Sequence, residues 1–180
     1  PALLGVTRPR PPAVDPRRIH LPVSEAVVDC AVYVDGARLP GKFTHAAALQ
    51  EARDLISAGR TAFVWIGLHE PDQHQMEAVA AVYGLHPLAV EDAVHAHQRP
   101  KVERYDDTLF LVLKTVKYLP HESVHLAHEI VETGEIMVFV GADFVVTVRH
   151  GEHTGLAEVR SDLESEPALL ALGRSEERRV

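Results

Sequence analysis

The chain has 180 residues, 46% of them hydrophobic and 24% charged, which is the composition of a globular domain with a sizeable core. Its formal net charge of −8 argues against a general nucleic-acid-binding protein, which would carry a basic surface. The single cysteine, Cys30, excludes a disulfide framework within the chain. No apolar run approaches the roughly 18–20 residues that span a bilayer, so we expect a soluble intracellular polypeptide.

Residues 1–22 are expected to form an extended arm. They hold six of the twelve prolines and show no apolar periodicity. Their four arginines and one aspartate give this arm a charge of +3, which leaves −11 for the rest of the chain. Such an acidic body suits cations as partners, or is simply soluble.

The next stretch has the pattern of a strand, a turn and a helix. Apolar and polar residues alternate over 28–34, the period of a half-buried strand in which Cys30 acts as a small hydrophobe. Asp35-Gly36 is a turn signal. Thr44 is placed to cap a helix with one apolar face, and Gly59 is placed to end it.

The middle of the chain predicts a buried strand followed by two helices. Residues 61–66 form an apolar run, which indicates a central parallel strand reached through a helical crossover. Pro71 fits the first turn of a second helix that Gly84 ends, and Pro87 begins a short third helix.

From Lys101 onward the hydrophobic period changes to two. This predicts strands over 102–105, 108–117, 124–131, 136–140 and 144–149, the last two joined as a hairpin. Residues 155–172 are helical in composition. The fold class is therefore α/β, with a mixed, partly antiparallel central sheet flanked by helices. We assign 23–173 to one domain and 174–180 to a polar tail or to sequence foreign to the domain.

The most distinctive chemistry is the carboxylate pair Glu91 and Asp92 in the second turn of the third helix. Neighbours on a helix lie about 100° apart, so both can present oxygens at one edge. Hard divalent cations such as Mg²⁺ prefer these ligands, although acids near a helix N-terminus also stabilise the helix without any metal. No nucleophile elbow and no glycine-rich phosphate loop is present, so we do not expect an enzyme.

The twelve histidines suggest an alternative function, zinc binding. His86, Glu91, Asp92 and His95 could capture Zn²⁺ in a standalone binding module, because His95 follows Glu91 by four residues and Asp92 by three. Scattered surface histidines are the simpler interpretation.

A set of motifs in fixed order resembles the cytoplasmic domain of CorA-type magnesium/cobalt transporters. The resemblance runs over about 26–172 and rests on FVWIGL at 63–68, GLHPLAVED at 84–92, HQRPKVE at 97–103, YDD at 105–107, LFLVLK at 109–114, GEI at 134–136, FVG at 139–141 and FVVTVR at 144–149.

The resemblance implies an α/β/α sandwich at the cytoplasmic face of the cell membrane, within a homopentameric channel for divalent cations. In that family the pair matching Glu91 and Asp92 binds regulatory Mg²⁺ against a neighbouring subunit, and an empty site loosens the ring. Co²⁺ is a further ion of the family, and a related branch transports Zn²⁺. A stalk of full length, the membrane helices and the Gly-Met-Asn pore motif of the family are not in this sequence. We therefore expect half of each site here, weak Mg²⁺ binding, no nucleic-acid partner and a fragment compatible with a monomer.

Overall fold

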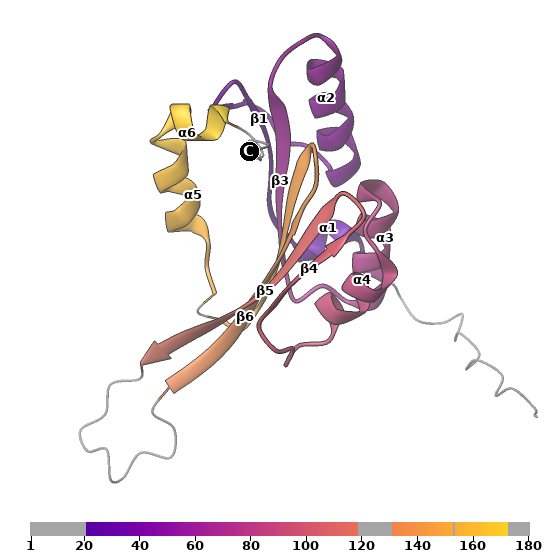
Figure 1. Cartoon of the computed structure of the whole chain (residues 1–180), viewed down its shortest axis with the longest axis vertical. Coiled ribbons are helices and arrows are strands. Elements are labelled where there is room, and N and C mark those ends of the chain that lie inside the picture. The colour runs from indigo at the N-terminus through magenta and orange to yellow at the C-terminus, as the bar shows by residue number, and fades with distance from the viewer. Residues whose placement is uncertain (1–20, 119–130, 153, 173–180) are drawn as a thin grey trace, which may run out of the picture.

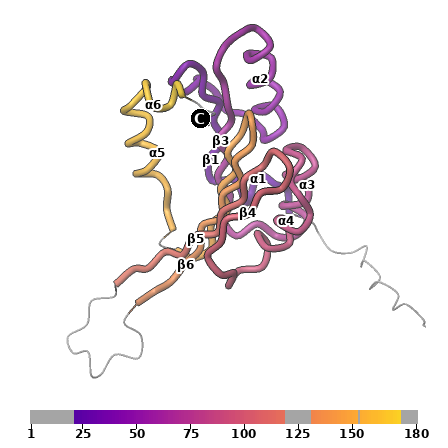
Figure 2. Tube along the Cα trace, in the orientation of Figure 1, coloured from indigo at the N-terminus to yellow at the C-terminus, as the bar shows by residue number. Residues whose placement is uncertain are grey.

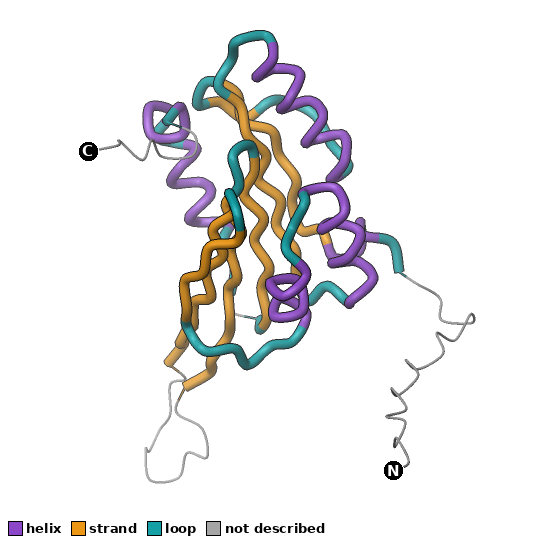
Figure 3. Tube along the Cα trace, turned by 45° about the vertical axis from the view of Figure 1, so that its right-hand side comes forward, coloured by secondary structure: helices purple, strands orange, loops and turns teal. Residues whose placement is uncertain are grey.

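The computed structural model describes residues 21–118, 131–152 and 154–172. Seven strands form one sheet, with helices α1–α4 on one face and α5 and α6 on the other (Figure 1, Figure 3). This is the α/β sandwich that the sequence predicts. The strands are β1 (Val27–Val34), β2 (Ala37–Arg38), β3 (Ala62–His69), β4 (Lys101–Tyr105), β5 (Thr108–Tyr118), β6 (Val131–Val140) and β7 (Phe144–His150). The helices are α1 (Val23–Ala26), α2 (His45–Ser57), α3 (Gln73–Tyr83), α4 (Pro87–Val94), α5 (Ala157–Glu164) and α6 (Pro167–Ala171).

The strand order is β2-β1-β3-β7-β6-β5-β4. Strand β3 is central and pairs in parallel with β7, but it is antiparallel to β1, so the expected parallel crossover from β1 to β3 is wrong. The reason lies before α2. The turn at Asp35 and Gly36 reverses the chain, and α2 then returns it to the end of the sheet where β1 finished. Val34, the last residue of β1, consequently lies opposite Ala62, the first of β3.

Strands β5 and β6 form a long antiparallel hairpin that extends beyond the helices (Figure 2). Strand β6 begins at Val131, five residues before the expected 136–140, because it stays paired with β5 as far as Tyr118. Most of the strand expected over 124–131 lies outside the described residues, as do 1–20 of the arm and 173–180 of the tail.

The helix boundaries follow local signals. The Thr44 hydroxyl accepts a hydrogen bond of 3.2 Å from the Ala47 N–H at the start of α2, as expected. Helix α3 begins two residues after Pro71, because Asp72 forms a reciprocal capping box with Gln75. Gly84 ends α3 with φ +68°. The helical stretch expected over 155–172 is two short helices, and Pro167 begins the second.

The main core lies between the sheet and helices α1–α4. Val32, Val64, Val146 and Phe139 are fully buried there, and Cys30 is 8% exposed in the same cluster. Burial, and then the nearby Asp29 carboxylate, raise the pKa of the Cys30 thiol to about 11. The cysteine is therefore a packing residue, as predicted. In the described part of the chain, no helix is both long enough and apolar enough to cross a membrane.

Candidate metal site

Helix α4 holds the two predicted metal ligands at a defined place on the domain. Pro87 occupies its first turn, and the Nδ1 atom of His86 accepts a hydrogen bond of 3.3 Å from the Leu88 N–H. Ala89, Val90 and Ala93 face the core and are at most 4% exposed. Burial of this apolar face fixes the rotation of the helix, so the residues between these positions must face outward.

Glu91 and Asp92 are two of these outward residues. Glu91 is exposed, and among the described residues its carboxylate has no hydrogen-bond or ion-pair partner. The Asp92 side chain is 24% exposed and lies beside the start of β4. The two acids therefore differ: one is free in solvent and the other is held in a polar contact.

The partner of Asp92 is Lys101, the first residue of β4. Its Nζ lies 2.7 Å from Asp92 Oδ2 and 2.8 Å from Glu103 Oε2. The Tyr105 hydroxyl donates a hydrogen bond of 2.8 Å to the same Glu103 oxygen. These contacts raise the pKa of Lys101, with Asp92 the larger cause and Glu103 the next, and the Lys101 ammonium in turn lowers the pKa of Glu103. The sequence pattern did not predict the Lys101–Asp92 pair.

A buried carboxylate on β6 holds the loop between α4 and β4. Glu135 is 4% exposed and accepts hydrogen bonds from the N–H groups of His97, at 2.5 Å, and Gln98, at 3.2 Å. It also pairs with Lys114. Burial alone would raise the pKa of Glu135, but these three donors outweigh burial and lower it. Glu135, Met137 and Phe139 share one face of β6. An acid at a position where the strand pattern expects a core residue is the sequence signal that could have identified Glu135.

The histidines near the pair do not assemble a zinc site in the described residues. The His86 ring stacks on the Tyr105 ring with centroids 4.3 Å apart. His95 Nδ1 lies 2.9 Å from the carbonyl oxygen of Glu91, on the backbone of its own helix. Within 21–118, 131–152 and 154–172, no three His, Cys, Asp or Glu side chains are grouped to hold a metal ion. The described residues therefore offer Zn²⁺ no preformed ligand set.

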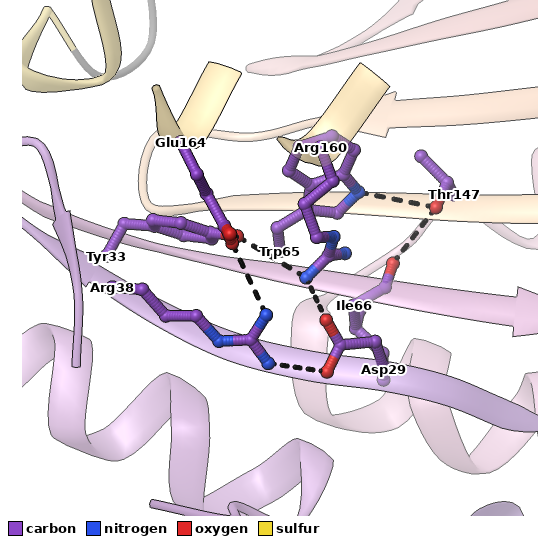
Figure 4. Close-up of polar contacts among 8 residues, drawn as sticks. All are labelled: Asp29, Tyr33, Arg38, Trp65, Ile66, Thr147, Arg160 and Glu164. Carbon is purple, nitrogen blue, oxygen red and sulfur yellow. Dashed lines mark hydrogen bonds and ion pairs between the residues drawn. The ribbon is translucent and has the colours of Figure 1, made fainter. Parts of the chain in front are cut away.

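A second polar cluster lies on the opposite face of the sheet and was not found from the sequence (Figure 4). Arg160 of α5 pairs with Asp29 of β1, and its guanidinium carbon lies 4.2 Å from the Trp65 ring centroid. Arg38 also reaches Asp29, at 2.8 Å, and the Tyr33 hydroxyl donates a hydrogen bond of 2.6 Å to Glu164. Because every charge in this cluster faces an opposite charge, the cluster attaches α5 to the sheet.

Comparison with known proteins identifies the family of the chain. The family model described as "CorA-like Mg2+ transporter protein" matches residues 60–174, which is more than half of the chain. The protein YfjQ of Bacillus subtilis, a candidate metal ion transporter, is 33% identical over 112 residues, covering 62% of this chain and 32% of YfjQ. The cobalt/magnesium transport protein CorA of Thermotoga maritima is 42% identical over 57 residues, covering 30% of this chain and 16% of that protein.

Solved structures share the fold. The full-length CmaX protein matches with a TM-score of 0.57 at 17% identity, covering 78% of this chain and 39% of CmaX. The soluble domain of CorA from Methanocaldococcus jannaschii matches with a TM-score of 0.50 at 15% identity, covering 79% of this chain and 49% of that domain.

The fold is thus that of the soluble domain of CorA-type proteins. The chain belongs to the CorA-like Mg²⁺ transporter family, as its motifs predicted. Members of this family transport ions and are not enzymes, which agrees with the absence of catalytic motifs from the sequence. The chain spans about a third of the length of YfjQ.

Proposed function

We propose that this chain is the Mg²⁺-sensing regulatory domain of a CorA-like transporter of divalent cations, Mg²⁺ and Co²⁺. Glu91 and Asp92 would supply one subunit's half of the sensing site. The observation that carries the proposal is the exposed edge of α4, where the core-facing residues of the helix turn both acids outward. Hard divalent cations are bound through such carboxylate oxygens and retain much of their water.

The proposed role depends on parts of the transporter outside this chain. The pore and the membrane helices would follow this domain, which would lie at the cytoplasmic face of the cell membrane. A homopentamer would bring an acidic surface of the neighbouring subunit against α4. One or two carboxylates bind Mg²⁺ weakly, so the second subunit would be needed to complete the site.

The physical basis of sensing is electrostatic. A bound divalent cation offsets the repulsion between carboxylates that face each other across the subunit interface. When the cation leaves, the acids repel, and the equilibrium moves away from the closed ring. This is a population shift driven by a ligand that binds one state better than the other.

Limited proteolysis of the complete transporter tests the proposal. Mg²⁺ should slow cleavage of the native protein, and Asp92→Ala should weaken this protection. The control is Asp162→Ala, an exposed acid on α5, which lies on the opposite face of the sheet (Figure 1); this variant should leave protection intact. Equal Mg²⁺ protection in the native protein and in Asp92→Ala would overturn the assignment of the site.

A further inference from the structure

The place beside Asp92 already holds a positive charge. The Lys101 ammonium bridges the carboxylates of Asp92 and Glu103 at 2.7 and 2.8 Å. These are the distances at which a charge-assisted hydrogen bond is strong. Any cation that binds Asp92 Oδ2 directly must take the position of this ammonium.

We propose that Lys101 is a tethered competitor of the divalent cation at Asp92, and that it sets the affinity of the sensing site. This inference rests on the proposed function of Glu91 and Asp92. Two positive centres cannot share one carboxylate oxygen without strong mutual repulsion. Binding of the ion therefore requires Lys101 to leave Asp92, and this requirement weakens the observed affinity.

The surroundings of Lys101 allow it to move without losing all of its contacts. Glu103 is the second carboxylate in reach, and the Tyr105 hydroxyl holds that carboxylate in place. The Lys101 ammonium also lies 5.8 Å from the centroid of the buried Phe110 ring. When an ion takes Asp92, the lysine keeps Glu103, so displacement breaks one of its two ion pairs.

The chemistry of lysine suits this role. Its ammonium is a compact point charge on a flexible stem, whereas a guanidinium would form a planar, two-pronged contact. The backbone on either side is fixed, because β4 pairs with β5 and Glu135 holds the loop that precedes Lys101. The side chain is thus the part that can move. Competition by a single charge favours divalent over monovalent ions, because the stronger charge is needed to displace it.

Titration of the 180-residue chain with Mg²⁺ tests the inference, with the chemical shift of the Asp92 amide as the readout. Lys101→Met should tighten binding by roughly threefold to tenfold, the range expected for loss of one competing ion pair. Lys101→Arg keeps the positive charge beside Asp92 and should therefore not tighten binding. Lys101→Gln provides a second neutral variant should Lys101→Met fail to fold.

A matched control separates competition from a change in net charge. Lys117→Met makes the same charge change on β5, where Lys117 is exposed and has no described partner, and it should alter the affinity by less than about twofold. In the double variant Lys101→Met with Asp92→Asn, the increase in Mg²⁺ affinity expected for Lys101→Met should disappear.

Two results would overturn the inference in distinguishable ways. If Asp92→Asn abolishes binding but Lys101→Met leaves it unchanged or weaker, the competitor role is wrong and the sensing site stands. If Mg²⁺ shifts no signal at Asp92 in the native chain or in Lys101→Met, both the competitor role and the proposed half-site fail.

Discussion

The Glu135 carboxylate accepts a hydrogen bond of 2.5 Å from the backbone N–H of His97, a residue with φ of +79°. A histidine in the left-handed region is uncommon, so this backbone conformation requires support from its surroundings. The support comes from β6, 38 residues further along the chain. One buried acid thereby connects the sheet to the loop that joins the candidate metal helix to β4.

Replacement of this acid should destabilise the domain. Glu135→Gln removes the charge that pairs with Lys114 and weakens the contacts to the two N–H groups. We expect the free energy of unfolding to fall by about 1–3 kcal/mol, because a buried contact loses its charged acceptor. Urea denaturation measures this change. The exposed Glu158→Gln on α5 is the control and should stay within about 0.5 kcal/mol of the native value; an equal loss in both variants would contradict the prediction.

The same acid should make stability depend on pH. Its folded-state pKa is lowered, so its contribution is fully present above the unfolded-state pKa of about 4.3 and is lost as pH falls through the folded-state pKa. The difference in unfolding free energy between native protein and Glu135→Gln should therefore be largest near pH 7 and shrink below about pH 4.3. Urea denaturation at several pH values measures it. A difference that stays constant down to pH 3 would argue against this role.

The sequence predicted the local features of the candidate site better than its long-range contacts. Pro87 and the spacing of the apolar residues placed the helix and turned Glu91 and Asp92 outward, because local signals and helical periodicity determine both. The pairing of Asp92 with Lys101 depends on how a six-residue loop bends, and the hydrophobic pattern carries no information on that.

The direction of strand pairing is another long-range feature that the local sequence pattern did not determine. Alternation and the apolar run of 61–66 predicted both strands and the central place of β3. Whether β1 and β3 run parallel depends on which end of the sheet α2 returns to, and this follows from the turn at Asp35 and Gly36 together with packing. The turn signal was recognised, but its effect on the following crossover was not.

A side chain at Gly134, next to Glu135, should destabilise the sheet. A Cβ at this position would lie 2.5 Å from Thr154 Cγ2, 2.8 Å from the His150 carbonyl oxygen and 2.9 Å from Thr115 Oγ1. The carbonyl belongs to the neighbouring strand β7 and cannot move without disturbing the sheet. We expect Gly134→Ala to lower the free energy of unfolding by about 1–3 kcal/mol, because overpacking forces the backbone to shift.

Gly155 is the matched control for this substitution. A Cβ there has no atom within 4 Å, and the residue does not have a positive φ. Gly155→Ala should therefore leave the unfolding midpoint unchanged or raise it slightly, since it reduces the freedom of the unfolded chain. Thermal denaturation of the two variants compares them directly. A Gly134→Ala protein as stable as Gly155→Ala would show that the sheet absorbs the extra methyl group.

The attachment of α5 to the sheet should depend on Arg160. Its side chain is 11% exposed, pairs with Asp29 and covers the Trp65 ring at 4.2 Å. Arg160→Met removes the charge, and we expect a loss of about 1–3 kcal/mol in the free energy of unfolding. Arg160→Lys keeps a charge for Asp29 but loses the planar stack on the ring, so its loss should be smaller, about 0.5–1 kcal/mol.

Tryptophan fluorescence reports on the attachment of α5 separately from stability, because Trp65 is the only tryptophan in the chain. Trp65 is 7% exposed, and its Nε1 donates a hydrogen bond of 3.4 Å to the Thr147 hydroxyl. Opening of α5 in Arg160→Met should expose the ring to water, shift its emission to longer wavelength and increase quenching by acrylamide in the folded state. Arg160→Lys should lie between the native protein and Arg160→Met. Native-like emission in both variants, together with native stability, would mean that α6 and its buried Leu170 hold this face of the sheet without the arginine.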